Sequence, residues 1–194
     1  MSNMRGTSEA ILACAQSLIV TGGYNGFSYA DIAGVVGIRK ASIHHHFPAK
    51  ADLVRTLVAR YREAAQAGLA AIGSHRPDPV DQLRAYTGYW QSCIADGSAP
   101  ICICALLASE IPVLPDPVAS EVRAHFRALS AWLAAVLERG REMGRIRLAA
   151  PPQAEAELFM ATVHGAMLSA RAFGEPAMFG TALAPLLGRL STET

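Results

Sequence analysis

Apolar residues recur along most of this chain at intervals of three and four, the spacing of α-helices that bury one face. Sustained alternation of apolar and polar residues, which marks β-strands, does not occur in the sequence. The clearest helical stripes are Ile11, Ala15, Leu18 and Ile19, then Leu53, Leu57, Val58, Tyr61 and Ala65, and then Val118, Val122, Phe126, Leu129, Leu133 and Val136. Proline and glycine clusters separate the stripes, so we expect an all-α fold of about nine helices.

Three helices are predicted in the first 50 residues. The first begins near Thr7 or Ser8, either of which can cap it, and ends at Gly22-Gly23. The segment 22–26 is glycine-rich, but no strand precedes it and no Gly-Lys-Ser/Thr follows it, so a helix stop is favoured over a phosphate-binding loop.

Two short helices follow. Ser28 and Asp31 have the spacing of a capping box, which starts a helix that runs to about Val36. Gly37 breaks it, and a further short helix passes through residues 41–44. Two short helices joined by a glycine-containing turn and packed on a longer helix form a helix-turn-helix unit. Because Pro48-Ala49 precedes a long helix that opens near Ala51, we expect one domain at 1–50 and a helical domain at 51–194.

Composition narrows the class of protein. The 194 residues are 52% hydrophobic and 17% charged with a net charge of +1, which excludes a disordered or polybasic chain. The sequence shows no export signal and no apolar run of the ~18 residues that a membrane span needs, so we expect a cytoplasmic protein without membrane contact. In that reducing compartment the four cysteines are expected to be free thiols.

The second short helix carries the candidate chemistry. Ile43 and Phe47 would anchor its inner side, while the outer side is rich in hydrogen-bond donors. Such a helix fits the major groove of DNA, where Arg and Lys bind guanine or phosphate and Ser binds a phosphate or a base edge. The exposed donors are Arg39, Lys40, Ser42, His44 and His45.

The block 27–53 resembles the DNA-binding motif of TetR-type (TetR/AcrR) transcriptional regulators. Ser28, Ile32-Ala33, Gly37-Ile38, His46-Phe47 and Lys50 stand at the places of that family's pattern. The resemblance implies that double-stranded operator DNA is bound. The family usually has Tyr at the place of His44. The implied contact residues are Ser28, Arg39, Lys40, Ser42, His44, His45 and Lys50.

Neither a metal nor a cofactor is expected. Three consecutive histidines on a helix point about 100° apart, so the side chains of 44–46 do not converge on one ion. His46, beside Phe47, is interpreted as a packed histidine rather than a DNA contact.

The resemblance also implies a helical body that binds a small-molecule effector and forms a homodimer through roughly 153–173 and 175–190. Two stripes would meet the second chain, with Gly165 allowing close approach. An intrachain core explains the same stripes, but DNA sites with two-fold symmetry require two DNA-binding domains, which favours the dimer. The stripes are Phe159, Val163, Ala166, Met167 and Ala170, and Met178, Leu183, Leu186, Leu187 and Leu190.

The segment 101–110 is similar to a subgroup of this family that responds to electrophilic or unsaturated small molecules, in which a Cys stands at the place of Cys102. If a helix starts just after Pro100, its N-terminal partial charge would lower the pKa of that thiol and make it a cysteine sensor. The alternative is that Cys102 and Cys104 are buried small hydrophobes. The predicted effector site comprises Tyr86, Tyr89, Trp90, Cys93, Cys102, His125 and Trp132.

The sequence therefore predicts a ligand-responsive DNA-binding repressor that is not an enzyme. Two alternatives stay open at this point. One is a thiol-dependent enzyme that pairs Cys102 or Cys104 with His125, although no motif supplies an orienting partner. The other is a helical interaction module that does not bind DNA.

Overall fold

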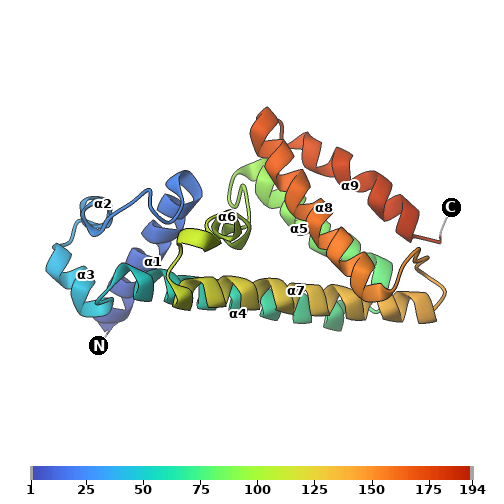
Figure 1. Ribbon diagram of the computed structural model, residues 1–194, viewed down its shortest axis with the longest axis horizontal. Coiled ribbons are helices and arrows are strands. Elements are labelled where there is room, and N and C mark those ends of the chain that lie inside the picture. Colours follow the sequence, from blue (N-terminus) through green and yellow to red (C-terminus); the bar gives the residue numbers. More distant parts are fainter. Residues whose placement is uncertain (1, 193–194) are drawn as a thin grey trace. The chain divides into compact units, whose positions relative to one another are not determined.

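A computed structural model describes residues 2–192 of the chain (Figure 1). Within this range there are nine α-helices, one short 3-10 helix and no named strand, so the predicted all-α fold is confirmed. No helix in the described range is long and apolar enough to cross a membrane. The elements are α1 Ser2–Gly22, α2 Tyr29–Val36, α3 Lys40–His46, α4 Lys50–His75, α5 Pro79–Asp96, α6 Ile103–Ser109, η1 Ile111–Val113, α7 Asp116–Glu142, α8 Pro152–Phe173 and α9 Ala177–Leu190.

Packing divides the chain into two compact units. The head unit comprises the chain up to Glu63 together with Ile103–His125, and the body unit comprises Ala64–Cys102 together with the chain from Phe126 onward. Helices α4 and α7 each contribute residues to both units. The head unit therefore contains α6 and η1 as well as the three N-terminal helices, and the domain boundary after residue 50 stays a prediction.

In the head unit, α1 buries Ile11, Ala15 and Ile19 and packs against α2 and α6. Helix α1 starts at Ser2, several residues before the predicted start, and Gly6 lies inside it without breaking it despite its low helix propensity. The prediction that Thr7 or Ser8 caps it is therefore wrong. The predicted end is confirmed, since Gly23 adopts a left-handed φ of 71° directly after the last helical residue.

In the body unit, α8 and α9 lie side by side and α5 packs against α9 (Figure 1). The α8 stripe predicted to meet a second chain is buried inside this chain, as are Leu183, Leu186 and Leu190 of α9. The assignment of these side chains to a dimer contact is therefore wrong, because they form the intrachain core. Helix α8 also exposes apolar residues, namely Leu158, Ala161, Gly165 and Leu168.

Candidate DNA-binding interface and effector site

The α2 and α3 pair is fixed by local signals that are visible in the sequence. Ser28 and Asp31 form the predicted capping box of α2, and Gly37 ends it with a left-handed φ of 73°. Ile43 and Phe47 are buried, and the buried Tyr29 hydroxyl donates to the Phe47 carbonyl over 2.9 Å. Burial, together with the nearby Asp52 carboxylate, raises the pKa of Tyr29 to about 12. The end of α3 is thus tied to α2.

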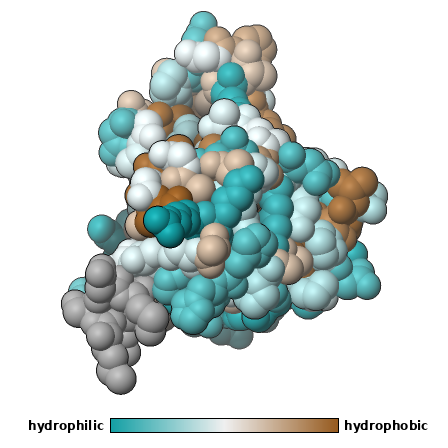
Figure 2. All heavy atoms as spheres, turned by 90° about the vertical axis from the view of Figure 1, so that its left-hand side faces the viewer, coloured by the Kyte–Doolittle hydropathy of each residue, from teal (hydrophilic) through white to brown (hydrophobic). Residues whose placement is uncertain are grey.

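The outer side of α3 carries the predicted contact residues. Arg39, Lys40, His44 and His45 are exposed, and Ser42 is half-buried. Figure 2 views the head unit from the side of α2 and α3, and hydrophilic side chains predominate on that face. Arg39 is the N-cap residue of α3, and its guanidinium, which has only donors, makes no bond with the first amides of the helix. This arrangement presents two cations at the N-terminal end of a seven-residue helix.

His44 has a defined ring orientation. Its Nδ1 lies 3.2 Å from the Pro48 carbonyl oxygen, and its ring packs edge-on at 4.8 Å from the Tyr29 ring. Because a carbonyl only accepts, the Nδ1 in this contact carries the proton. In that tautomer Nε2 of the neutral ring is an acceptor, and the contact with a phosphate that is expected from His44 stays a prediction. His46 is half-buried and its ring lies 6.3 Å from that of Phe47.

Ser28 and Lys50 have internal roles in the head unit. The Ser28 hydroxyl donates to Asp31 over 2.8 Å and accepts from the Ala30 amide. The bonds from Ser28 lower the pKa of Asp31. The Lys50 ammonium donates to the Phe27 carbonyl, and its partial burial lowers its pKa. The contacts with phosphate that are expected from both residues stay predictions.

Most of the predicted effector residues lie in the body unit. Tyr86 is buried, with its ring 5.7 Å from Trp132 and 6.5 Å from Phe159. Burial raises the pKa of Tyr86, and the charge of a Cys102 thiolate adds to this shift. Cys102 is buried and directly precedes the first residue of α6. Trp90 is also buried, with its ring 5.3 Å from that of Tyr89.

Three of the predicted effector residues, Tyr89, Cys93 and His125, are exposed, half-buried or outside the body unit, and their role as effector contacts stays a prediction. Tyr89 is 57% exposed and Cys93 is half-buried, so neither side chain lies in the interior of the body unit. His125 belongs to the head unit, where its ring lies 5.5 Å from Tyr61 and a ring nitrogen lies within 4.8 Å of the Cys104 sulfur. None of the four cysteines forms a disulfide within the described residues.

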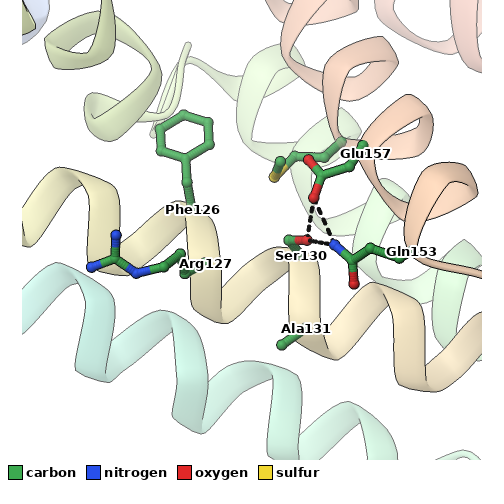
Figure 3. A pocket seen from close by; sticks show the side chains of 7 residues that line it. Phe126, Arg127, Ser130, Ala131, Gln153 and Glu157 are labelled. Carbon is green, nitrogen blue, oxygen red and sulfur yellow. Dashed lines mark hydrogen bonds between the residues drawn. The ribbon is translucent and has the colours of Figure 1, made fainter.

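A pocket of about 280 Å³ opens between α7 and α8 of the body unit, and none of the predicted effector residues lines it (Figure 3). One side of it is a closed polar network: Ser130 donates to Glu157 over 2.7 Å, and the Gln153 amide donates to both over 2.7 Å. Sequence reasoning missed this pocket because its polar residues come from two helices and form no motif. The lining residues are Phe126, Arg127, Ser130, Ala131, Gln153, Glu157 and Met160.

Two family models match the chain. The model described as "Bacterial regulatory proteins, tetR family" covers residues 11–57, and the one described as "Tetracyclin repressor-like, C-terminal domain" covers residues 79–186, more than half of the chain. The first contains the whole α2 and α3 pair.

Individual proteins agree with these models. A crystal structure of a TetR-family transcriptional regulator from Agrobacterium tumefaciens is 60% identical over 97% of this chain and 100% of that one, with a TM-score of 0.96. The transcriptional repressor NemR of Escherichia coli is 25% identical and covers 85% of this chain and 84% of its own. The regulator CymR of Pseudomonas putida is also 25% identical, over 69% of this chain and 67% of its own. The chain belongs to the TetR family of bacterial, ligand-responsive, DNA-binding transcriptional regulators.

Proposed function

We propose that this protein is a repressor that binds a palindromic operator as a homodimer in the cytoplasm and releases it when a small molecule occupies the body unit. The observation that supports DNA binding most strongly is the α2 and α3 pair, in which buried Ile43 and Phe47 hold a short helix whose outer side bears Arg39 and Lys40. A helix of this kind inserts into the major groove. Within a two-fold dimer, two such helices read half-sites about 34–36 Å or somewhat further apart.

The exposed side of α8 supports the dimer. Leu158 and Leu168 are each 50% exposed, and Ala161 and Gly165 lie between them on the same face. Positions spaced by three, four and three residues form one helical stripe, and the two small residues allow a second helix to approach closely. We assign this stripe, with the exposed side of α9, to the contact between two copies of the chain, in place of the buried stripe predicted from the sequence.

The DNA contacts are tested by Arg39→Ala and Lys40→Ala. If Lys40 binds a phosphate, Lys40→Ala weakens binding to all sequences alike. It also reduces the slope of log affinity against log salt concentration by about one for each protomer. If Arg39 reaches a base edge, Arg39→Ala relaxes the preference at one position in each half-site and costs about 1–3 kcal/mol. Titration of duplexes from in vitro selection at several salt concentrations measures both effects.

Arg123→Ala is the control for these two variants, because it removes an exposed cation of the head unit that lies on α7 rather than α3. Equal, salt-insensitive losses for Arg39→Ala and Lys40→Ala would contradict the assigned contacts. If the wild-type protein left the mobility of every duplex unchanged at low salt, the interaction module without DNA binding would be favoured instead.

The effector is proposed to act through Cys102. An electrophilic alkene would accept the thiolate sulfur at one carbon, and the proton that left the thiol would end on the other carbon of the former double bond. Cys102 is buried directly before α6, so an adduct there forces apart groups that are now packed around it. The α7–α8 pocket is a second candidate for non-covalent effectors.

N-ethylmaleimide is a suitable probe of this sensor. We expect it to release the wild-type protein and Cys104→Ser from operator DNA and to leave Cys102→Ser bound. Cys93→Ser is the control, because Cys93 is half-buried and therefore an accessible thiol that is not proposed to act. If Cys102→Ser and Cys104→Ser both keep wild-type release, the thiol mechanism is wrong and the effector binds without a covalent bond. If the protein consumed more than one equivalent of an electrophile per thiol, the alternative of a thiol-dependent enzyme would be favoured instead.

A further inference from the structure

A carboxylate next to α6 binds the turn that leads into the DNA-binding helices. Glu110 directly follows α6, and the Tyr24 backbone amide donates to its two oxygens over 3.2 and 3.0 Å. Tyr24 lies in the turn between α1 and α2. The partners are 86 residues apart in sequence, so this contact joins two distant segments of the head unit. A hydrogen bond to a charged acceptor is about twice as strong as one between neutral groups.

Gly23 shows how closely the turn approaches that carboxylate. A Cβ at this position would lie 2.2 Å from a Glu110 oxygen, which is shorter than any real contact. Gly23 also has a φ of 71°, a conformation that only glycine adopts freely. The backbone conformation at the end of α1 therefore favours glycine, and any Cβ at this position would push the flexible end of the Glu110 side chain away from its present place.

The same turn is connected to the start of α4. The Lys50 ammonium lies 4.8 Å from the centre of the Tyr24 ring and 4.0 Å from that of Phe27, a cation–π arrangement. Partial burial lowers the pKa of Lys50, and the carboxylates of Asp31 and Glu110 oppose that shift. Glu110 therefore acts on the turn by hydrogen bonding and on the first residue of α4 by charge.

We propose that Glu110 is the positioning residue that couples α6 to the DNA-binding helices. This inference rests on the proposed function, because it needs operator binding. Helix α6 carries Cys104 and begins directly after Cys102, so a change at either thiol that displaces α6 also displaces Glu110 from the Tyr24 amide. The turn then loses the contact that fixes the entry into α2.

Thermodynamic reciprocity makes this coupling testable without an effector. If the position of α6 changes the affinity for DNA, then DNA must change the stability of α6 by the same factor. We expect operator binding to slow amide exchange at Tyr24 and in α6, as well as in α2 and α3. A glutamate that only stabilised the fold would not transmit DNA binding to α6.

The experiment is residue-resolved amide hydrogen exchange on the full-length protein, free and bound to a duplex recovered by in vitro selection. In Glu110→Ala, operator should still slow exchange in α2 and α3 but no longer in α6, and operator affinity should fall roughly 5–150-fold, the usual range of a coupling. For Glu110→Gln, which keeps one acceptor oxygen, the protection of α6 by operator and the operator affinity should both lie between those of the wild type and those of Glu110→Ala. Ser109→Ala is the control, since within the described residues the Ser109 hydroxyl bonds to its own helix, at the Leu106 carbonyl.

A second measurement keeps the proposal falsifiable if Glu110→Ala folds poorly. Gly23→Ala should weaken operator binding more in the wild-type background than in the Glu110→Gln background, because the uncharged amide of that variant yields more easily to the new methyl group. The proposal is overturned if operator slows amide exchange in α6 equally in the wild type and in Glu110→Gln. It is also overturned if operator binds both proteins but slows amide exchange in α6 in neither. A wild-type protein that binds no duplex would overturn the proposed function and this coupling together.

Discussion

Leu168→Glu is expected to convert the protein into monomers and to weaken operator binding by about 100-fold or more. Leu168 is half exposed on the apolar outer side of α8, where nothing in the described chain covers it fully. A carboxylate there would face the second copy of the chain and would have to lose its hydration on association. A monomer has one head and loses the avidity of two linked heads, which is worth about 10²–10⁴-fold.

Sedimentation at micromolar concentration and a binding titration with a full palindrome measure these two losses. Met143→Glu is the matched control, because Met143 is 56% exposed in the body unit and lies after α7, outside the α8 and α9 surface. The thermal unfolding of Met143→Glu should stay near that of the wild type, since exposed substitutions rarely change stability by more than about 0.5 kcal/mol, whereas Leu168→Glu also loses the stabilisation that dimerisation adds, so its helix content is compared by circular dichroism. A dimeric Leu168→Glu with full operator affinity would place the interface elsewhere.

Helix α8 has two apolar faces, one buried in the chain and one exposed, which is why the sequence alone did not single out the exposed one. Phe159 and Val163 lie on the buried side of the helix, and Leu158 and Leu168 lie on the exposed side. Within each pair, the spacing is that of residues on one face of a helix. Hydrophobic periodicity identifies faces but does not say which face meets the same chain. The larger, more continuous stripe is the natural choice for a dimer contact, whereas packing against α9 already buries it.

The head unit is easier to predict because its signals are local. The capping box at Ser28 and the glycine at 37 each fix a backbone feature within a few residues, and the structure confirms both. Long-range partners leave no such trace. Nothing near Glu110 in the sequence indicates a bond to the Tyr24 amide, and Ser130 gives no sign of meeting Glu157 across a pocket.

Arg189→Ala is expected to destabilise the body unit. Arg189 of α9 donates to both oxygens of Glu155 on α8, over 3.1 and 2.6 Å, and the Ala149 amide donates to the same carboxylate. The Glu155 side chain is only 3% exposed. Removing the guanidinium leaves a buried carboxylate with backbone donors alone, and water reaching the half-exposed Arg189 site would offset part of the cost. We expect a loss of about 2 kcal/mol, roughly 4–8 °C in Tm.

The pH dependence of this loss identifies its cause. The hydrogen bonds from Arg189 lower the pKa of Glu155 below its usual 4.5. A carboxyl group with a lowered pKa in the folded state stabilises the fold above its unfolded pKa, and this contribution disappears as pH falls through the folded pKa. The stability difference between wild type and Arg189→Ala should therefore be full at pH 7 and shrink below about pH 4.5. The matched control is Arg141→Ala, which removes an exposed ion pair with Glu138 and should cost less than about 0.5 kcal/mol at any pH.

If the stability difference between wild type and Arg189→Ala persisted unchanged in acid, lost packing of α9 rather than the lost ion pair would be the cause of the destabilisation.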